Sequence, residues 1–452
     1  MPLHCILIAN RGEIARRIIR SARAAGVETV AVASEADREA LHVRDADHHV
    51  IIGPAPATAS YLNVGALLEA ARSTQADAVH PGYGFLSENA DFARAVLDAG
   101  LTWIGPDPET IAQMGDKVAA RQAAQAAGVP VLPGTEGPVD DDTDVEALLE
   151  DTGVPLVIKA AAGGGGRGIR RVDRAEDFAA TLQQARGEAA SVFGDPRVYV
   201  ERFVPRARHV EVQIMGDGTH FVHLGDRDCT WQRRSQKLIE EAPAPDLPDA
   251  VRDQIRTSSV ALAERVGYTG VGTVEFLYDP QRQEAAFIEM NTRLQVEHPV
   301  TEAITGIDLV AEQLRIAAGH GLSVTQADVS FSGHAIECRL NAEDPHRNFF
   351  PSPGTLSDVT WPSGEGVRVD AAVETGSVVA PFYDSMIAKL IVHGDDRTAA
   401  IAATQDALRK TRLDGITTTV PAVLALVGRP EFADVTHHTT LIEQSPEILE
   451  AS

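Results

Sequence analysis

The sequence predicts a mixed fold in which an open parallel α/β domain comes first and α+β domains follow it. Apolar runs alternate with stretches of helical periodicity over residues 1–114, as in a parallel sheet whose strands are joined by helices. Strands with alternating polar and apolar residues become frequent after residue 204. The length of 452 residues exceeds what one hydrophobic core usually organises, so we expect several domains.

The first domain, expected over residues 1–114, begins with a strand, a helix and a second strand. The apolar run 3–9 is followed by Ile14 and Ile18 at helical spacing, and a second apolar run covers 27–33. Later strands are predicted at 78–80 and 101–104, and helices at 61–71 and 88–97. This alternation is typical of an open, Rossmann-like parallel sheet.

A connecting helix and a small lid are predicted next. Residues 110–127 are rich in Ala and Gln, which favours a single helix ended by Gly128 within a linker over 115–130. The Pro- and Gly-rich stretch that follows predicts a hinge. The lid is expected over 131–203, with strands at 154–160 and 197–200 and a helix at 175–190. The chain then continues as a central domain over 204–330 and a C-terminal α+β domain over 331–452.

Composition and charge exclude several classes of function. The 40 basic and 65 acidic residues give a net charge of −25, which opposes nonspecific binding to nucleic acid or anionic membranes. The three cysteines are far apart and lack the spacing of a zinc site or a disulfide framework. No apolar segment approaches a membrane span or a signal peptide, so a cytoplasmic protein without a membrane anchor is expected.

A glycine-rich loop follows the strand that ends in Lys159. In the segment AAAGGGGRG (160–168), Gly164, Gly165 and Gly166 let the backbone approach a triphosphate and offer it N–H groups. A flexible loop without a ligand is the alternative, since the segment matches neither the P-loop nor the dinucleotide pattern. Lys159 favours phosphate binding, because a lysine that ends an apolar run needs an anion unless it extends into solvent.

Lysine is scarce in this chain. Only five of the 40 basic residues are lysine, and Lys117, Lys159 and Lys237 all lie in polar motifs. This placement indicates positions that require a compact, flexible ammonium group in place of a planar guanidinium. Chance is the alternative explanation for so small a number.

The alternation of side chains along predicted strands indicates a polar site. In HVEVQI (209–214), His209 shares one face with two other polar residues, and the valines and isoleucine face the other way. Two further strands are predicted to form a hairpin that presents Glu275 and Glu289. If the backbone stays extended after Glu289, the same face carries further polar side chains at Asn291, Arg293, Gln295 and Glu297.

This polar row predicts a metal site. Glu275, Glu289 and Asn291 offer the hard oxygen ligands that Mg²⁺, or Mn²⁺, prefers when it also binds ATP phosphates. A hairpin face that is simply solvated is the alternative, but Thr292, Leu294 and Val296 on the reverse side favour packing.

Several long motifs together resemble the biotin carboxylases, enzymes of the ATP-grasp group. The resemblance covers essentially the whole chain and is far more specific than the glycine loop. It is carried by IANRGEIA (8–15), HPGYGFLSEN (80–89), MGDK (114–117), HVEVQ (209–213), QRRSQK (232–237), EEAPAP (240–245), EMNTRLQVEHPVTE (289–302) and AIECRLNAEDP (335–345). It implies an ATP-grasp lid and core within the predicted α/β and α+β architecture.

The resemblance also implies roles for individual residues. The residues implied to bind ATP are Lys117, Lys159, Glu201, Val204, His209, Gln232 and Leu277, together with the metal ligands Glu275, Glu289 and Asn291. Glu297 would deprotonate bicarbonate, whose attack on ATP gives carboxyphosphate, and Arg339 would stabilise the biotin enolate. Lys237, Arg293, Gln295 and the Val296 backbone resemble the bicarbonate-binding set.

Physical chemistry adds two expectations about these groups. A base for bicarbonate works best with a pKa raised toward neutrality, which Glu289 would favour and Arg293 would oppose at Glu297. The alternation of residues 335–341 places Arg339 with Glu337 and Asn341 on one face, which suits an arginine that faces the site. A surface ion pair is the alternative for Arg339.

Two positions depart from the family pattern. Ala162 stands where the glycine loop of the family usually begins, and Ser235 replaces a frequent histidine. The first departure puts the flexibility of the loop in doubt, and the second puts in doubt any contact made by that histidine.

Partners and competing functions follow from the same resemblance. No lysine is flanked by methionines, so biotin is expected on a separate biotin carboxyl carrier protein, and the carboxyltransferase subunit is the further partner expected. Members of the family usually form homodimers. They are the biotin carboxylase subunits of acetyl-CoA carboxylase, which acts in fatty acid biosynthesis, of other acyl-CoA carboxylases or of pyruvate carboxylase. The alternatives are another ATP-grasp ligase, which joins a carboxylate to an amine, and a catalytically silent regulatory subunit.

Overall fold

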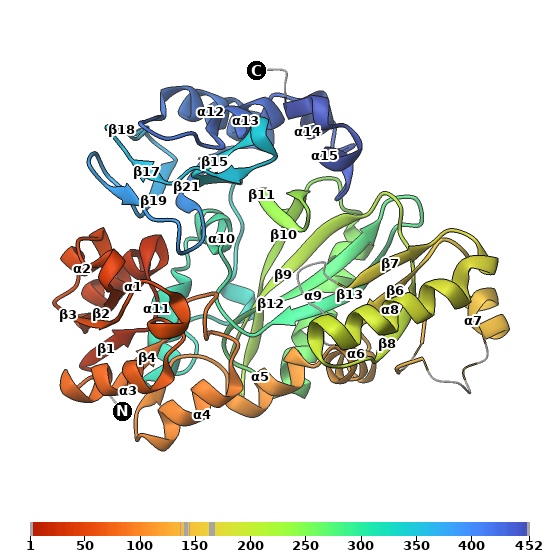
Figure 1. The fold of residues 1–452 in the computed structure, drawn as a ribbon, viewed down its shortest axis with the longest axis horizontal. Coiled ribbons are helices and arrows are strands. Elements are labelled where there is room, and N and C mark those ends of the chain that lie inside the picture. The colour runs from red at the N-terminus through yellow and green to blue at the C-terminus, as the bar shows by residue number, and fades with distance from the viewer. Residues whose placement is uncertain (1–2, 136, 140–142, 144, 162–167, 450–452) are drawn as a thin grey trace.

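The computed structural model describes residues 3–135, 137–139, 143, 145–161 and 168–449 (Figure 1). The N-terminal region forms a five-stranded sheet of order β3-β2-β1-β4-β5, and every neighbouring pair in it is parallel. Its strands are β1 (Cys5–Ile8), β2 (Glu28–Ser34), β3 (His48–Gly53), β4 (Ala78–His80) and β5 (Thr102–Trp103). The predicted open parallel sheet is therefore confirmed.

Helices cover both faces of this sheet, since the two faces belong to separate apolar clusters. Ile14 and Ile18, predicted at helical spacing, are buried against Ile6 and Ile8 of β1 in one of them. The third helix begins later than predicted, because the Asn63 side chain caps it by accepting a hydrogen bond from the Ala66 N–H. The helices of this region are α1 (Gly12–Ala24), α2 (Leu41–Asp45), α3 (Val64–Ser73) and α4 (Ala90–Asp98).

The connecting segment contains two helices where a single helix was predicted. Helix α5 (Pro108–Gly115) and helix α6 (Lys117–Ala126) are separated at Asp116. The backbone of Asp116 is extended, and its carboxylate accepts hydrogen bonds from the N–H groups of Val118 and Ala119. The break follows from this capping, because an aspartate at a helix start satisfies N–H groups that have no partner within the helix.

The region predicted to be a lid contains a three-stranded antiparallel sheet of order β7-β6-β8 (Figure 1). Its two outer strands include β7, which the sequence interpretation did not predict. The lid elements are α7 (Val145–Thr152), β6 (Leu156–Ala160), β7 (Ile169–Val172), α8 (Phe178–Phe193) and β8 (Val198–Arg202).

An eight-stranded sheet forms the centre of the molecule, in the order β13-β12-β9-β10-β11-β14-β21-β19. It continues across residue 330, so strands of both predicted C-terminal regions share it. The domain bounds drawn from the sequence stay a prediction. The strands are β9 (Arg208–Asp217), β10 (Phe221–Arg233), β11 (Gln236–Ala242), β12 (Thr269–Asp279), β13 (Glu284–Asn291), β14 (His334–Asn341), β19 (Val367–Ala371) and β21 (Met386–Gly394).

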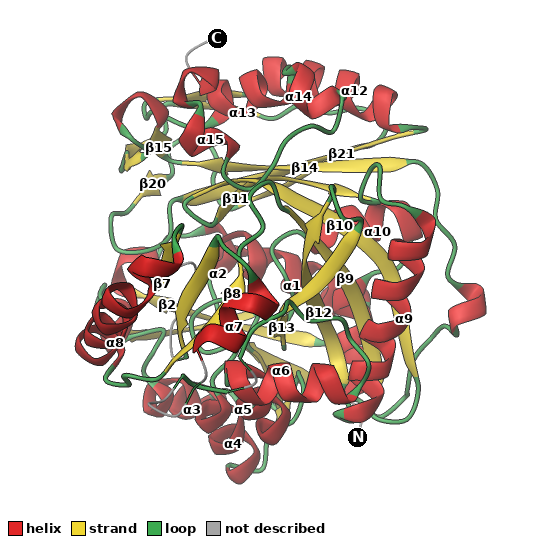
Figure 2. Ribbon diagram, turned by 90° about the vertical axis from the view of Figure 1, so that its right-hand side faces the viewer, coloured by secondary structure: helices red, strands yellow, loops and turns green. Residues whose placement is uncertain are grey.

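Helices cover one face of this sheet at both of its ends, since the strand register places Val210 and Ile336 on the same side. Helices α6 and α9 (Asp249–Arg265) bury Val210, Val212 and Ile214 of β9. Figure 2 shows β14 and β21 lying beneath α12 (Arg397–Lys410) and α13 (Val420–Val427). The remaining elements are α10 (His298–Thr305), α11 (Leu309–Ala317), α14 (Pro430–Ala433), α15 (Leu441–Gln444), β15 (Glu343–Asp344), β16 (Phe350–Pro351), β17 (Gly354–Thr355), β18 (Asp358–Thr360), β20 (Val378–Val379) and β22 (Arg412–Asp414).

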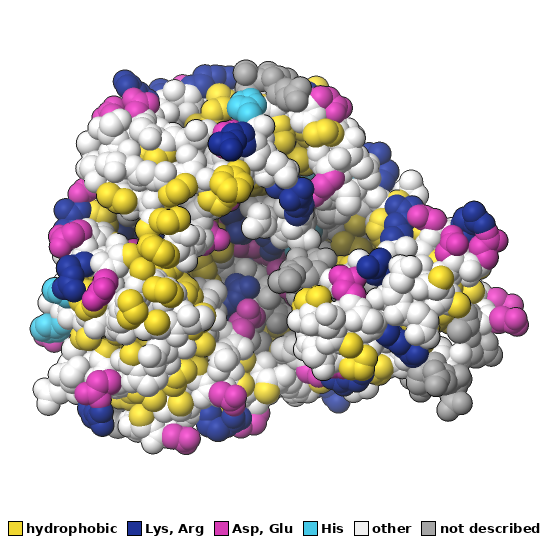
Figure 3. Space-filling view, viewed as in Figure 1, with side chains coloured by type: hydrophobic (Ala, Val, Ile, Leu, Met, Phe, Trp, Pro, Cys, Tyr) yellow, Lys and Arg dark blue, Asp and Glu magenta, His cyan; other side chains and the backbone are white. Residues whose placement is uncertain are grey.

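Among the residues that the structure describes, we find no helix with the length and apolar character that crossing a bilayer requires. Figure 3 shows that the molecule is hollowed between the lid and the N-terminal region, with charged side chains visible inside the hollow. This hollow contains the candidate site.

Candidate active site

A cavity of about 870 Å³ lies between the central sheet, the lid and the N-terminal region. It has the size of a site for a nucleotide-sized ligand. Every described residue among the predicted site residues lines it, namely Lys117, Lys159, Glu201, Val204, His209, Gln232, Lys237, Glu275, Leu277, Glu289, Asn291, Arg293, Gln295, Val296, Glu297 and Arg339. Gly164, Gly165 and Gly166, together with Ala162, lie outside the described residues.

The predicted hairpin exists, and its register places the two acidic residues side by side. Glu275 of β12 pairs directly with Glu289 of β13. The register shifts immediately after this pair, so that Phe276 pairs with Phe287. Because of this irregularity, Ile288 lines the cavity as Glu289 does, whereas strict alternation had predicted that it faces away.

The backbone does not stay extended after Asn291, as the sequence interpretation had assumed. Strand β13 ends at this residue, and Glu297 occupies the N-cap of α10. Arg293, Gln295 and Glu297 nevertheless all line the cavity. Leu294 explains this geometry, because its complete burial in an apolar cluster anchors the irregular segment from behind.

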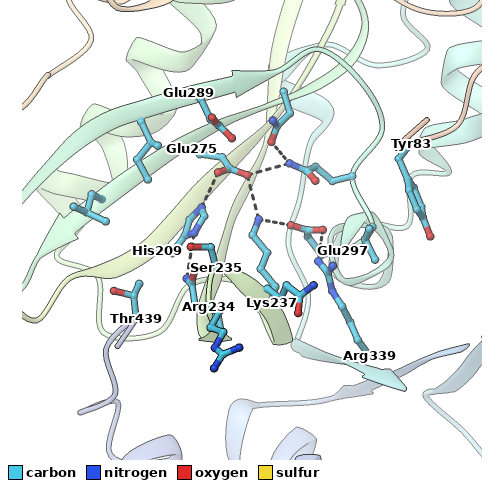
Figure 4. Close-up of a pocket in the computed structure, with 18 of the residues that line it drawn as sticks. Tyr83, His209, Arg234, Ser235, Lys237, Glu275, Glu289, Glu297, Arg339 and Thr439 are labelled. Carbon is cyan, nitrogen blue, oxygen red and sulfur yellow. Dashed lines mark hydrogen bonds and ion pairs between the residues drawn. The ribbon is translucent and has the colours of Figure 1, made fainter. Parts of the chain in front are cut away.

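Lys237 lies at the centre of a buried charge cluster (Figure 4). Its Nζ lies 2.7 Å from Glu211, 3.1 Å from Glu275 and 2.5 Å from Glu297. Burial disfavours the charged ammonium, but these three carboxylates outweigh it and raise the pKa of Lys237 well above its usual range. Lys237 is therefore a fixed cation at the base of the cavity.

Glu297 is ionised, which decides a balance between Glu289 and Arg293 that the sequence left open. Burial favours the protonated form, but Lys237, Arg339 and Arg227 outweigh it and hold the pKa of Glu297 well below its usual range. The sequence argument had weighed Glu289 and Arg293, whereas the cations with the largest effects come from β10, β11 and β14. A group in this state is a carboxylate ready to accept a proton, although with a small driving force.

Arg339 lies beside Glu297 in the wall of the cavity. Its Nε donates to Glu240 at 2.5 Å, and its Nη2 donates to Glu297 at 2.9 Å. The side chain is 17% exposed and lines the cavity. This confirms the face predicted for Arg339 and excludes a surface ion pair as its only role.

Two further lysines, Lys117 and Lys159, line the cavity on the side of the lid. Lys159 forms an ion pair with Glu201, which also accepts a hydrogen bond from Arg121 at 2.7 Å. Burial lowers the pKa of Lys117, against the opposing effects of Glu289 and Glu201. Two ammonium groups therefore face the same space, where a polyanion would relieve their repulsion.

An apolar patch lies next to these lysines. Leu277 packs against Leu132, Val204, Ala207 and Ala286. Since Leu277 and Val204 also line the cavity, the patch offers an apolar surface of the kind against which an adenine ring packs.

The predicted metal ligands fit a divalent cation by their chemistry. Burial and the neighbouring Glu275 both raise the pKa of Glu289, which shows the like-charge repulsion that a cation would remove. Glu275 and Asn291 add a second carboxylate and an amide oxygen, and all three line the cavity. A second set of possible ligand atoms, from His209, Glu211 and Glu275, lies within 4.8 Å. Lys237 binds both glutamates of this second set, so the second set forms an ion-pair cluster in this structure.

Three described residues at the site carry roles that the sequence interpretation missed. Lys389 is completely buried, donates to the Val296 carbonyl at 2.8 Å and lies 3.3 Å from Glu13. Glu88 forms an ion pair with Arg293 at 2.7 Å. The sequence does contain a signal for Lys389, because it interrupts the apolar run MIAKLIV as Lys159 ends the run VIK.

Replacement of Lys389 by methionine is expected to destabilise the protein by about 3–5 kcal/mol, because it leaves Glu13 buried without its cation. Urea unfolding measures this loss. Lys410→Met, at a lysine that is 60% exposed and ion-paired on α12, is the control and should cost less than about 1 kcal/mol. Adding Glu13→Gln to Lys389→Met should restore part of the stability, and an unchanged double variant would contradict this pairing.

Three family models match the chain in succession. "Biotin carboxylase, N-terminal domain" matches residues 2–111, "Carbamoyl-phosphate synthase L chain, ATP binding domain" matches 116–325, and "Biotin carboxylase C-terminal domain" matches 337–444. Together these models cover most of the chain.

Curated relatives and solved structures agree with these models. The chain is 49% identical to biotin carboxylase 1 of Bacillus subtilis, over 97% of this chain and 98% of that protein. It is 51% identical to the biotin carboxylase of Pseudomonas aeruginosa, over 92% of each. The biotin carboxylase domain of Hydrogenobacter thermophilus 2-oxoglutarate carboxylase, solved as a dimer with MgADP, ADP and bicarbonate, is 41% identical with a TM-score of 0.93, covering 100% of both chains. The chain therefore belongs to the biotin carboxylase family.

Proposed function

We propose that this protein uses ATP and bicarbonate to carboxylate biotin, which a separate carrier protein presents. One observation supports this function above the others. The Glu297 carboxylate, held between Lys237 and Arg339, shares a single cavity with Lys117 and Lys159 of the nucleotide side. A base, an anion-binding lysine and an acceptor-facing arginine thus lie beside a phosphate-binding region.

In the proposed nucleotide site, the adenine lies on the patch formed by Leu277 and Val204. Glu201 binds at its edge, and Lys117, Lys159, His209 and Gln232 contact the phosphates or ribose. Gly164, Gly165 and Gly166 are further proposed ATP-binding residues, which lie outside the described residues. Glu275, Glu289 and Asn291 would hold Mg²⁺ or Mn²⁺, which supplies positive charge against the phosphate oxygens. Fixed cations around a transferring phosphoryl group lower the barrier because they meet charge already in place.

In the proposed bicarbonate site, Glu297 removes the proton of bicarbonate. Lys237, Arg293, Gln295 and the Val296 backbone hold the anion beside it. Attack of the resulting oxygen on the γ-phosphate gives carboxyphosphate and ADP. Carboxyphosphate then breaks down to CO₂ and phosphate.

In the proposed acceptor site, the phosphate removes the N1 proton of biotin. Arg339 stabilises the negative charge that develops on the ureido oxygen, because a guanidinium held by two carboxylates is fixed before the reaction begins. The biotin nitrogen then attacks CO₂ to form carboxybiotin.

Partners and setting form part of the proposal. We propose a homodimer in the cytoplasm that works with a biotin carboxyl carrier protein and a carboxyltransferase. A relative from Methanothermobacter thermautotrophicus that is named as one of the subunits of pyruvate carboxylase is 46% identical over 97% of this chain. This relative supports pyruvate as one proposed final acceptor. Acetyl-CoA, as in fatty acid biosynthesis, and another acyl-CoA are the other proposed acceptors, and we propose that the carboxyltransferase selects among them.

The test is an assay of ADP release in which bicarbonate and free biotin are each omitted in turn. We expect release to require bicarbonate and to increase when biotin is added. Turnover that needs no bicarbonate but requires an amine and a carboxylate would instead identify another ATP-grasp ligase. MgATP binding without turnover under every condition would identify a silent regulatory subunit.

A further inference from the structure

Two buried glutamates lie directly opposite each other behind Arg339. Glu240 of β11 and Glu337 of β14 are register partners in the antiparallel part of the central sheet. Both side chains are completely buried. Opposed residues on neighbouring strands have their Cβ atoms about 5 Å apart, so two negative charges here would repel each other strongly.

The surroundings of this pair are largely apolar. Helix α10 packs against β11, β14 and β21, which form this part of the sheet. Ala242, Val300, Ile304, Ala335 and Ile391 form one apolar cluster between the helix and the sheet. Glu337 itself pairs across the sheet with Ile391. A second charge in such surroundings has little water to solvate it.

Hydrogen bonding distinguishes the two carboxyl groups. Glu240 Oε1 accepts a hydrogen bond from Arg339 Nε at 2.5 Å. Within the part of the chain that the structure describes, Glu240 Oε2 and both oxygens of Glu337 have no hydrogen-bond partner. An ionised carboxylate that is buried without partners is unstable, whereas a protonated one is tolerated.

The other ionisable groups around the pair do not supply the missing positive charge. Lys389 of β21 faces the pair, but it lies 3.3 Å from Glu13 and donates to the Val296 carbonyl. Lys237 of β11 is bound by three other carboxylates, and Arg339 is shared with Glu297.

Two further groups on neighbouring elements are neutral. Burial raises the pKa of the Cys229 thiol on β10 and lowers the pKa of His298 on α10, so neither carries charge at neutral pH.

The pKa shifts of the two carboxyl groups agree with this arrangement of charges. Burial raises the pKa of Glu337 well above its usual range, and Glu240 adds to the shift although Lys389 and Arg339 oppose it. Burial also raises the pKa of Glu240 to about 7, against the opposing effect of Arg339. Glu337 is thus the member of the pair with the greater affinity for a proton.

We propose that Glu240 and Glu337 form a carboxyl pair that holds one proton at neutral pH, mainly on Glu337, and that positions Arg339 for the acceptor. With the proton present, Arg339 faces two carboxylates, Glu240 and Glu297, and keeps a fixed orientation. Without it, a third negative charge would lie behind the guanidinium and reduce the positive potential that it presents to the acceptor. Both glutamates are positioning residues, and the proposal rests on the acceptor role proposed for Arg339.

The first test compares glutamine variants of two buried glutamates. Glu337→Gln replaces a protonated carboxyl with a neutral group of the same shape, so the melting temperature is expected to stay within about 2 °C. The matched control is Glu241→Gln, at the residue next to Glu240, where Arg397 and His334 bind the ionised carboxylate. That control is expected to lower the melting temperature by several degrees. Equal losses in both variants would overturn the proposal.

Infrared difference spectroscopy tests the proton directly and needs no activity. The wild type at neutral pH is expected to show the carbonyl stretch of a buried protonated carboxylic acid, and Glu337→Gln should lose this band. The band should persist in Glu241→Gln. Absence of the band from the wild type would overturn the proposal even if Arg339 proves essential for biotin carboxylation.

The positioning role predicts a separate kinetic effect. Glu240→Gln is expected to lower kcat/KM for biotin about tenfold or more, while bicarbonate-dependent ADP release without biotin changes less than about threefold. Its pH profile should also lose the ionisation near 7. Equal losses of both activities would overturn the positioning role. If Arg339→Ala leaves biotin carboxylation intact while the infrared band is present, the acceptor role of Arg339 fails and the carboxyl pair stands.

Discussion

Arg339→Ala is expected to lower the rate of biotin carboxylation by at least about 10²-fold and to leave the affinity for MgATP unchanged within about twofold. The reason is geometric, because Arg339 forms ion pairs with Glu240 and Glu297, whereas the proposed phosphate contacts come from Lys117 and Lys159. Carboxybiotin formation and nucleotide binding, measured on the same preparation, separate the two effects.

The matched control for this variant is Arg397→Ala. Arg397 and Arg339 are both 17% exposed, and each binds a fully or almost fully buried glutamate of β11. Arg397 binds Glu241 on the opposite face of the strand, away from the cavity, so its loss should reduce stability without a selective effect on biotin. Carboxylation at the wild-type rate in Arg339→Ala, or an equal kinetic loss in Arg397→Ala, would contradict the assignment.

Glu297→Gln is expected to reduce bicarbonate-dependent ADP release by about 10²–10⁴-fold, because glutamine cannot accept the proton of bicarbonate. The substitution also leaves Lys237 and Arg339 with less negative charge between them, so bicarbonate itself is expected to bind at least as tightly as in the wild type. Single-turnover measurements of ADP formation at saturating bicarbonate isolate the loss of the base from any change in binding.

Glu302→Gln serves as the control, because Glu302 lies in α10, which Glu297 precedes as the N-cap residue. Glu302 is almost fully buried and binds Arg17 and Arg368 away from the cavity. It should alter stability more than turnover.

Since the pKa of Glu297 is held below its usual range, protonation of Glu297 cannot account for activity lost between about pH 8 and 6. Full ADP release in the Glu297→Gln variant would exclude Glu297 as the base.

The hairpin shows which side-chain directions strand alternation predicts correctly and which it does not. A period of two residues placed Glu275 and Glu289 on one face, and the structure pairs them directly. The same reasoning placed Arg339 toward the site. It failed at Ile288, because one irregular pairing changes the direction of a side chain without changing the composition of the strand.

The prediction of one helix in the connecting segment was wrong for a related reason. Helix propensity favoured one continuous helix, but Asp116 is a better helix start than a helix interior residue, and its side chain caps α6. The short strand β7 was missed because its burial alternates only weakly and depends on pairing with β6.

The sequence by itself determined the family, the open parallel sheet and the identity of the polar residues along the hairpin, because these depend on residue type and on short-range periodicity. Only the tertiary structure decided which charges meet. Lys237, Glu211, Glu297 and Arg339 come from four separate segments, and Lys389 reaches the Val296 carbonyl from a fifth. Protonation depends on the distance between such groups and on their loss of water, and both quantities arise only when distant segments pack together.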